Sequence, residues 1–492
     1  MNRQPVSLEL REHKILFLLG LLAAVHLYVF IGTFPFFNNV DEQSHLDLVV
    51  RYSQADIPRS LEPYSPEACH YIVIFGTSEY VSTRPVTAPP WTLPWSEIQS
   101  QVLGKELAYR KAQNHEVSQP PLYYSVMSGW WRLTGLAFQG GTRLYLLRFF
   151  NLIPVIALML LGWRIAVRLF PENWFIRIAV PAFIALMPQT TFYSINNDVF
   201  SPLLFGFVFL LLLKFQDAEV PDPRQAFWLG VALAGTFLTK LTNLPLLAVT
   251  MIFISWKIYQ LARAGKLPAA GPSLGILAAT ALLPMAAWLT WCKLRFGDPT
   301  GSAQKIQFLG WTSKPFLEWF HHPIFTPKGF WIFISENLST FWQGEFLWRL
   351  KPLALPGVDH FYVFLTLVLL LVALIVLLKF RKTLTPRQQN AAIFGFSCLV
   401  AMFAFFALLS VKYDFHDCFN PSRAHPYFTS GRLMLGMLIP FLLLLALGMD
   451  RLFNKVPELK FPVLALVLAF MAVSEIMVDW RIFSNPYNWF HM

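Results

Sequence analysis

Residues 15–45 read ILFLLGLLAAVHLYVFIGTFPFFNNVDEQSH, a long apolar run that ends at a polar stretch with two adjacent acids. The apolar part, Ile15 to Thr33, is long enough to cross about 30 Å of hydrocarbon as a helix. It lacks a small-residue cleavage site, and a long polar segment follows it. We therefore expect a retained first membrane span rather than a cleaved signal peptide.

The composition extends this interpretation to the whole chain. Of its 492 residues, 55% are hydrophobic and 14% are charged, whereas water-soluble globular proteins have about 25% charged residues. This excludes a cytosolic enzyme, a disordered chain and a small disulfide scaffold. The sequence predicts an all-α polytopic membrane protein with about 11 transmembrane helices. After the first span, the predicted spans are 144–163, 176–195, 199–213, 226–239, 243–260, 272–292, 361–378, 390–411, 433–449 and 461–478.

Basic residues indicate how these spans are oriented. The formal net charge is +11, and Lys and Arg concentrate in short segments on one side, such as Arg3, Arg11 and Lys14 before the first span. Because short cytoplasmic loops are enriched in Lys and Arg, we predict a cytoplasmic amino terminus and an outward-facing carboxyl terminus. Membrane topology then explains the net positive charge, and no nucleic-acid partner is needed. A bacterial inner membrane fits this topology.

Polar sequence concentrates on the outer side of this topology. We expect residues 1–293 to form a membrane module with its first outer loop at 34–143. Residues 294–492 add an outer loop at 294–360 and four carboxyl-terminal spans. Both large loops are rich in Trp, which favours interfacial helices lying along the membrane surface. The stretch 121–136 is too short to span and predicts one such helix.

An acidic pair and a histidine, Asp41, Glu42 and His45, lie where the first span leaves the membrane. In a helix, Asp41 and His45 are one turn apart and face the same way. This arrangement suits acid–base chemistry at the outer surface. The alternative is that Asn39 or Asp41 only caps an interfacial helix.

Two further polar sites interrupt apolar sequence at the outer boundary. One is Asn196-Asn197-Asp198, and carboxylates at membrane depth are costly and usually functional. The alternative there is a simple polar turn. The other is Lys240, for which a snorkelling side chain is the alternative.

The outer loops supply the remaining candidates. They are His115, Glu116, Gln119 and Tyr123 in the first loop, and Arg423 and Arg432 in the last. Most of the 11 His residues are predicted to lie outside. Imidazole and carboxylate groups suit several divalent metals, so a metal is compatible with this face, although no pair has a diagnostic ligand spacing. No other cofactor is predicted. Cys69 and Cys418 both face outward, where disulfides form, and are a candidate disulfide pair.

The sequence also limits the chemistry. It contains neither a G-x-x-x-x-G-K-[ST] loop nor a G-x-G-x-x-G following a strand, so no nucleotide site is visible. An outer-facing enzyme has no nucleotide supply. Its activated donor has to arrive through the membrane, attached to a lipid.

Four short motifs occur in a fixed order on the predicted outer side: Asp41-Glu42, Q-P-P-L-Y-Y at 119–124, N-N-D at 196–198 and G-R-L-M-L at 431–435. Together they resemble the GT-C superfamily of membrane glycosyltransferases. The most similar groups are protein O-mannosyltransferase and aminoarabinose transferase relatives, and bacterial membrane proteins of unknown function whose first loop reads P-x-x-x-D-E-x-x-H. The likeness covers roughly residues 10–300 in architecture.

The resemblance implies an inverting sugar transfer from a polyprenyl-phosphate donor to a glycan, glycolipid or protein acceptor at the outer leaflet. Asp41 and Glu42 are then the predicted catalytic acids, with Asp41 as base or acceptor-orienting group. Gln119 stands where aminoarabinose relatives have a lysine, so the resemblance leaves the phosphate partner open. Arg432 is the first choice and Lys240 the second, because both are predicted to lie at the outer boundary of a span. The other candidates named above, Asp198 and His45 among them, are predicted to bind substrate.

Two hypotheses of other classes compete with this one. The first is a transporter or flippase of lipid-linked glycans, for which polar residues near the membrane midplane are typical. The second is a non-catalytic envelope scaffold that uses its Trp-rich outer loops as docking surfaces. Because the polar candidate residues lie at the outer boundary of the membrane rather than at its midplane, the sequence favours an enzyme.

Overall fold

The computed structural model describes residues 6–77, 88–348 and 351–492, so that Arg3 lies outside the described residues. The helices of the amino-terminal part are α1 (Val6–Thr33), α2 (Glu42–Ser53), α3 (Pro66–Phe75), α4 (Trp95–Tyr109), α5 (Leu122–Gly135), α6 (Gly140–Phe149), α7 (Leu152–Leu169), α8 (Trp174–Ala185), α9 (Ser201–Asp217), α10 (Pro223–Thr239), α11 (Leu244–Arg263) and α12 (Leu267–Phe296). The carboxyl-terminal helices are α13 (Ser302–Phe308), α14 (Pro327–Gln343), α15 (Pro356–Lys379), α16 (Pro386–Lys412), α17 (Leu438–Leu452) and α18 (Lys460–Asp479). Short 3-10 helices include η2 (Thr190–Tyr193), η3 (Asn197–Val199), η4 (Leu241–Asn243) and η8 (Gly431–Met437).

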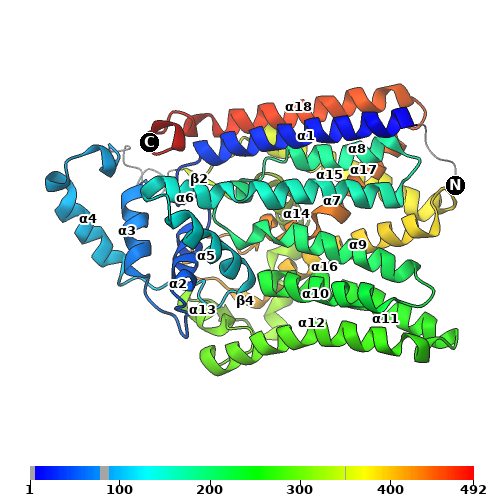
Figure 1. Ribbon diagram of the computed structural model, residues 1–492, viewed down its shortest axis with the longest axis horizontal. Helices are drawn as coiled ribbons and strands as arrows, with labels where there is room; N and C mark the ends of the chain where they lie inside the picture. The colour runs from blue at the N-terminus through cyan, green and yellow to red at the C-terminus, as the bar shows by residue number, and fades with distance from the viewer. Residues whose placement is uncertain (1–5, 78–87, 349–350) are drawn as a thin grey trace.

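The long helices run side by side in one bundle (Figure 1). Helices α2, α3, α4 and α5 gather at one end of it, on the left in the figure, where the chain also ends. We call this the outer end, and the opposite end, where α1 begins, the inner end. Strand β1 (Thr312–Ser313) pairs with β4 (Tyr413–Asp414), and β2 (Leu347–Trp348) pairs with β3 (Lys351–Pro352).

Among the described residues, nine helical segments are long and apolar enough to cross a membrane. The prediction of an all-α polytopic membrane protein is confirmed by this length and composition. These segments are Leu10–Thr33, Gly140–Leu169, Asn197–Asp217, Leu241–Arg263, Leu267–Phe296, Pro356–Lys379, Pro386–Lys412, Gly431–Leu452 and Pro457–Ile482, and each contains one of the predicted spans.

The two other predicted spans, 176–195 and 226–239, correspond to shorter helices. Helix α8 has 12 residues, which rise about 18 Å and fall short of the hydrocarbon thickness. After it the chain continues without a further α-helix to η3, yet every residue from Phe175 to Val199 is buried. Irregular backbone at membrane depth is tolerated where protein surrounds it. Helix α10 has 17 residues, and the count of 11 spans stays a prediction.

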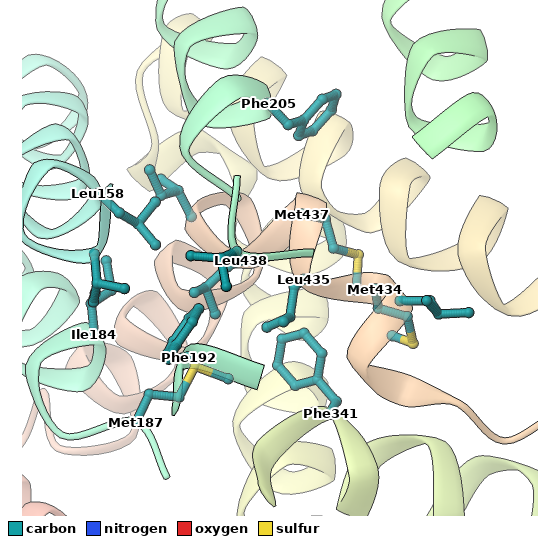
Figure 2. Close-up of a cluster of buried hydrophobic side chains, with 14 of the residues drawn as sticks. Leu158, Ile184, Met187, Phe192, Phe205, Phe341, Met434, Leu435, Met437 and Leu438 are labelled. Carbon is teal, nitrogen blue, oxygen red and sulfur yellow. The ribbon is translucent and has the colours of Figure 1, made fainter. Parts of the chain in front are cut away.

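Helix α17 is the centre of the bundle. Every residue from Gly431 to Asp450 is buried, and α17 packs against α8, α9, α15 and α16. Figure 2 shows Leu435 and Leu438 surrounded by side chains of other elements, among them Phe192. Because η8 continues directly into α17, residues of η8 are fixed by the same packing.

The two large loops that are predicted to face outward are mostly helical as well. The stretch 121–136 forms one helix, α5, as predicted. Helices α2 to α5 occupy the loop 34–143, and α13 and α14 occupy the loop 294–360. Pairing of β1 with β4 joins this second loop to the last outer loop. That these helices lie along a membrane surface stays a prediction.

Close contact between α15 and α17 leads to the first prediction. A Cβ added to Gly448 would lie 2.1 Å from the Leu369 carbonyl oxygen, so Gly448→Ala has to push the two backbones apart. We expect a loss of about 1–3 kcal/mol in stability, measured as a lower midpoint of thermal unfolding in detergent. The matched control is Gly275→Ala, where an added Cβ meets nothing within 4 Å and Ala is the better helix former. Equal midpoints for both variants would contradict this account.

Candidate functional site

Asp41 sits in the turn between α1 and α2. It occupies the N-cap position of α2 with a left-handed backbone, φ 64°, but its side chain does not cap the helix. Its carboxylate instead faces two cationic groups, His115 Nε2 at 3.1 Å and Arg432 Nη2 at 3.3 Å. The side chain is 22% exposed. Asp41 therefore points into a polar cluster rather than stabilising its own helix.

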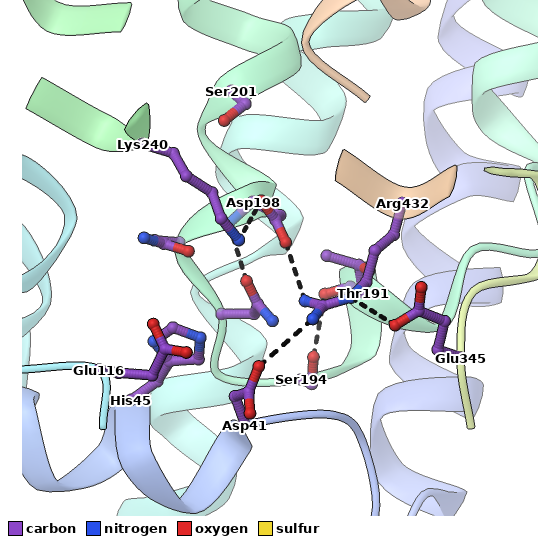
Figure 3. A network of polar contacts seen from close by, with 12 residues as sticks. Asp41, His45, Glu116, Thr191, Ser194, Asp198, Ser201, Lys240, Glu345 and Arg432 are labelled. Carbon is purple, nitrogen blue, oxygen red and sulfur yellow. Dashed lines mark hydrogen bonds and ion pairs between the residues drawn. The ribbon is translucent and has the colours of Figure 1, made fainter. Parts of the chain in front are cut away.

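Arg432 joins three carboxylates from distant parts of the chain (Figure 3). Besides Asp41, its guanidinium contacts Asp198 at 3.0 Å and Glu345 at 2.9 Å. It stands at the start of η8, and its side chain is buried. The neighbouring Gly431 allows this position, because an added Cβ would lie 1.9 Å from the Asn337 carbonyl oxygen.

Lys240 is a buried ion-pair partner rather than a snorkelling side chain. It separates α10 from η4 in an extended conformation, and its Nζ lies 2.6 Å from Asp198. Burial lowers the pKa of Lys240 more than Asp198 raises it. The polar-turn alternative holds only for Asn196, whose side chain accepts a hydrogen bond from the Asp198 backbone N–H.

Glu116 forms the other side of the cluster. Its carboxylate pairs with Lys305 of α13, lies 3.4 Å from His115 Nε2 and accepts a 2.5 Å hydrogen bond from Gln119. Burial favours the neutral acid, but the neighbouring positive charges together, Lys305 first and then His115, lower the pKa of Glu116 to about 2. Gln119 also accepts a 3.2 Å hydrogen bond from Asn197, which links the loop before α5 to η3.

Positive charge controls the ionisation of Asp41. Burial acts to raise its pKa, but the hydrogen bond from His115 and the charges of His115, Lys305 and Arg432 hold the pKa well below its usual range. The carboxylates of Asp41 and Glu116 in turn outweigh the effect of burial on His115 and raise its pKa. Asp41 is therefore a carboxylate, stabilised by cations that an anionic ligand could attract away.

We refer to these residues together as the outer-end cluster. Its members are Asp41, His115, Glu116, Asp198, Lys240, Lys305, Glu345 and Arg432.

Glu42, the neighbour of Asp41, has a different environment. It is fully buried and forms a two-point ion pair with Arg148, at 2.7 and 2.6 Å. It also accepts hydrogen bonds from the backbone N–H groups of Phe37 and Ile195, both at 2.9 Å. Arg148 in turn donates to the carbonyl oxygens of residues 34 and 35. Glu42 thus fixes the α1–α2 turn and contacts none of the outer-end cluster through these bonds.

His45 of α2 and Tyr123 of α5, both predicted to bind substrate, are not members of the outer-end cluster. His45 is buried, and its Nδ1 is 2.7 Å from the hydroxyl of Tyr124. Burial lowers the pKa of His45 to about 4, so the imidazole is neutral at physiological pH. Tyr123 is also buried and packs its ring against Phe200. His45 therefore supports the α2–α5 contact, whereas Tyr123 packs α5 against the residue before α9.

Arg423 and the two cysteines are placed differently from the prediction. Arg423 is exposed and contacts Asp414, at 2.9 Å, and His416 of its own loop. Cys69 is a buried free thiol, and Cys418 is also free. The predicted disulfide between them is therefore wrong for this structure, because Cys69 packs inside the first outer loop, where its thiol points to the Tyr64 carbonyl oxygen at 3.7 Å.

Two cluster members, Lys305 and Glu345, had no signal in the sequence. Each is a single charge in the loop 294–360 without a motif around it. A further polar group was also missed within the membrane-spanning part, where His26 lies 2.6 Å from Glu475 and Tyr193 donates to the same carboxylate. This group joins α1, η2 and α18.

Three residues of the cluster have the chemistry of metal ligands. Asp41, His115 and Glu116 each offer one ligand atom, and these atoms lie within 4.8 Å of one another. Such a set fits a divalent cation of the imidazole–carboxylate type. The cation would compete with Lys305 for Glu116 and with Arg432 for Asp41. A metal therefore stays a prediction, and the ammonium and guanidinium groups already neutralise the acids.

Comparison with known proteins adds no family to this picture. No protein-family model matches the chain, and no curated protein sequence matches it.

The different environments of Asp41 and Glu42 lead to the second prediction. Glu42→Gln leaves Arg148 buried without its counter-charge, which costs about 3–5 kcal/mol. We expect a much lower unfolding midpoint in detergent. Asp41→Asn is the matched control and should cost less than about 1 kcal/mol, because Asp41 is partly exposed and Arg432 keeps two other carboxylates.

Removing both buried charges, as Glu42→Gln with Arg148→Met, should recover part of the loss. If Glu42→Gln and Asp41→Asn unfolded at the same temperature, the scaffolding role of Glu42 would be refuted.

Proposed function

We propose that this protein is a GT-C-type glycosyltransferase. It moves a sugar from a polyprenyl-phosphate donor to a glycan, glycolipid or protein acceptor of the cell envelope, with inversion at the anomeric carbon. One observation carries the proposal: the partly exposed Asp41 carboxylate lies against the buried Arg432, beside two further cations, Lys240 and Lys305. A carboxylate next to several cations suits the transfer of a sugar from a phosphate to an acceptor.

In the proposed reaction an acceptor hydroxyl attacks the anomeric carbon from the face opposite the phosphate. The bond from this carbon to the phosphate oxygen breaks, and its electron pair leaves with the lipid phosphate. The hydroxyl proton passes to Asp41. Because the phosphate gains charge as the bond breaks, Arg432, Lys240 and Lys305 stabilise the transition state through positioned donors. Charges and atoms balance without a metal.

Ionisation of Asp41 connects donor binding to proton transfer. The cations that hold its pKa low are the groups a phosphate attracts. A bound donor adds negative charge and draws these cations away, so the pKa of Asp41 rises. A carboxylate of higher pKa is a stronger base. Asp41 would therefore become an effective base only once the donor is in place.

The proposed location is a bacterial inner membrane with the amino terminus in the cytoplasm. The outer-end cluster then lies at the outer leaflet, where no nucleotide is supplied but lipid-linked sugars are presented. Positive charge near the inner end supports this orientation. Membrane lipid surrounds the bundle, and the donor reaches the cluster laterally.

The third prediction concerns Asp41. Asp41→Asn keeps the shape of the side chain but cannot accept the proton, so we expect transfer to fall by about 10²–10⁴-fold. The measurement is mass spectrometry of glycans formed by purified protein from defined polyprenyl-phosphate sugars and membrane extract. Asp414→Asn, another outer acid, which pairs with Arg423, is the control and should keep full activity.

Full activity of Asp41→Asn would refute the assignment of Asp41. If the protein moved a lipid-linked sugar across the liposome membrane without forming a new glycosidic bond, it would be a flippase and not a glycosyltransferase.

The fourth prediction concerns Lys305. Its side chain is 29% exposed, and Glu116 keeps His115 and Gln119 as partners, so Lys305→Gln should still fold. It removes one charge-assisted contact, which contributes about 1.5–3 kcal/mol, and we expect kcat/KM for the donor to fall by about tenfold or more. The control is Lys328→Gln, at an exposed lysine of α14. Unchanged donor kinetics in Lys305→Gln would remove Lys305 from the phosphate site.

A further inference from the structure

A second polar region lies at the inner end of the bundle, on the right in Figure 1. It is an open cavity of about 1120 Å³, which is large enough for a sizeable ligand. Its wall is formed by the ends of α7, α9 and α17, the starts of α8, α16 and α18, the loops before α8 and α16 and one residue of α11. No residue of the outer-end cluster belongs to it.

Cations on this wall are arranged around shared acids. Asp217 is held by two arginines, Arg168 at 2.7 Å and Arg387 at 2.8 Å. Asp450 likewise contacts Lys460 at 2.6 Å and Arg451 at 3.6 Å. Each aspartate therefore neutralises only one of its two cations. Even with Glu172 counted as an anion, the wall keeps an excess of positive charge.

Donor groups on the same wall lack acceptors. The buried side-chain N–H groups at Arg168 Nε and Trp174 Nε1 have no hydrogen-bond partner among the described residues, and Arg451 Nε has only the Asp450 carboxylate at 3.6 Å, beyond hydrogen-bond distance. Unsatisfied donors are rare in folded proteins and call for an acceptor. The excess of positive charge on an open wall suits an anion with several oxygens.

A narrow apolar pocket of about 20 Å³ adjoins the polar cavity. The two share Gln216, Asp217, Arg387 and Asn390, so the charged wall passes directly into the apolar one. The apolar side is lined by phenylalanines and leucines of α9, α11 and α16: Phe209, Leu212, Leu213, Phe253 and Phe394. A polar wall that passes into an apolar one suits an amphiphile, although the apolar pocket itself has room only for the first part of a chain.

We propose that the inner-end cavity binds an anionic phospholipid, with the phosphate against Arg168, Arg387 and Arg451 and the start of an acyl chain at the apolar pocket. Basic pockets between transmembrane helices on the cytoplasmic side are suited to anionic headgroups. The predicted orientation places this end in the cytoplasmic leaflet. The site is independent of sugar transfer and holds together the inner ends of α7, α9, α16 and α17.

The experiment is native mass spectrometry of the delipidated full-length protein with added lipids. The probes are dioleoyl phosphatidylglycerol, dioleoyl phosphatidylcholine, glycerophosphoglycerol and inorganic phosphate. We expect phosphatidylglycerol to bind about tenfold more tightly than phosphatidylcholine. The double variant Arg387→Gln with Arg451→Gln should weaken phosphatidylglycerol binding by about tenfold or more, since each basic residue contributes to headgroup attraction.

The matched control removes two cations at the same end outside the cavity, as Arg263→Gln with Lys382→Gln, and should bind like the unmodified protein. The single variant Arg387→Gln tests whether misfolding explains the result, because this side chain is 59% exposed and its loss should not disturb folding. It should show a smaller loss of phosphatidylglycerol binding than the double variant. Equal binding of the two diacyl lipids, or equal losses in both double variants, would overturn the proposal. If glycerophosphoglycerol or phosphate bound as tightly as the intact lipid, the ligand of the cavity would be a free anion and not a phospholipid.

Discussion

The buried charge of Arg432 has to be neutralised, and this requirement organises the outer end of the protein. Arg432 stands at the start of the most deeply buried helical segment. Moving an ion out of water costs several kcal/mol unless it is paired. Its partners come from three other parts of the chain: Asp41 from the turn after α1, Asp198 from η3 and Glu345 from the segment after α14. Segments far apart in sequence therefore have to meet where α17 begins.

The charges of the outer-end cluster nearly cancel, and its acids differ in how exposed they are. Among the carboxylates, Asp41 is 22% exposed, whereas Glu345 is 13%, Glu116 3% and Asp198 2% exposed. The buried acids hold the cations in place before any ligand arrives, and such preorganisation is what electrostatic catalysis requires. In the proposed reaction the buried acids position the cations, and Asp41, the most exposed acid, accepts the proton of the acceptor hydroxyl.

Local sequence patterns predicted the helices well but could not predict three-dimensional charge partners. Long apolar runs predicted nine of the spanning segments, because hydropathy acts along the chain. The adjacent acids Asp41 and Glu42 looked equivalent, yet a left-handed residue at 41 sends them in different directions. Lys305 and Glu345 joined the cluster without any motif, since only the packing of distant loops brings them there. In the predicted span 176–195 the helix extends only to Ala185, for a related reason: burial by neighbours lets the chain stay irregular after that residue.

The apolar centre of the bundle bears on whether this protein transfers or transports. Between the outer-end cluster and the inner-end cavity, residues 433–449 are apolar and buried, and Figure 2 shows the side chains packed around them. A glycan that crossed along this path would have to separate α17 from α8, α9, α15 and α16 and expose much of the core, at a cost of about 25 cal/mol for each Å² of apolar surface. Transfer at the outer end needs no such movement, because a lipid-linked donor can arrive laterally and the acceptor from the outer side. The described packing therefore supports chemistry at one face over passage through the centre.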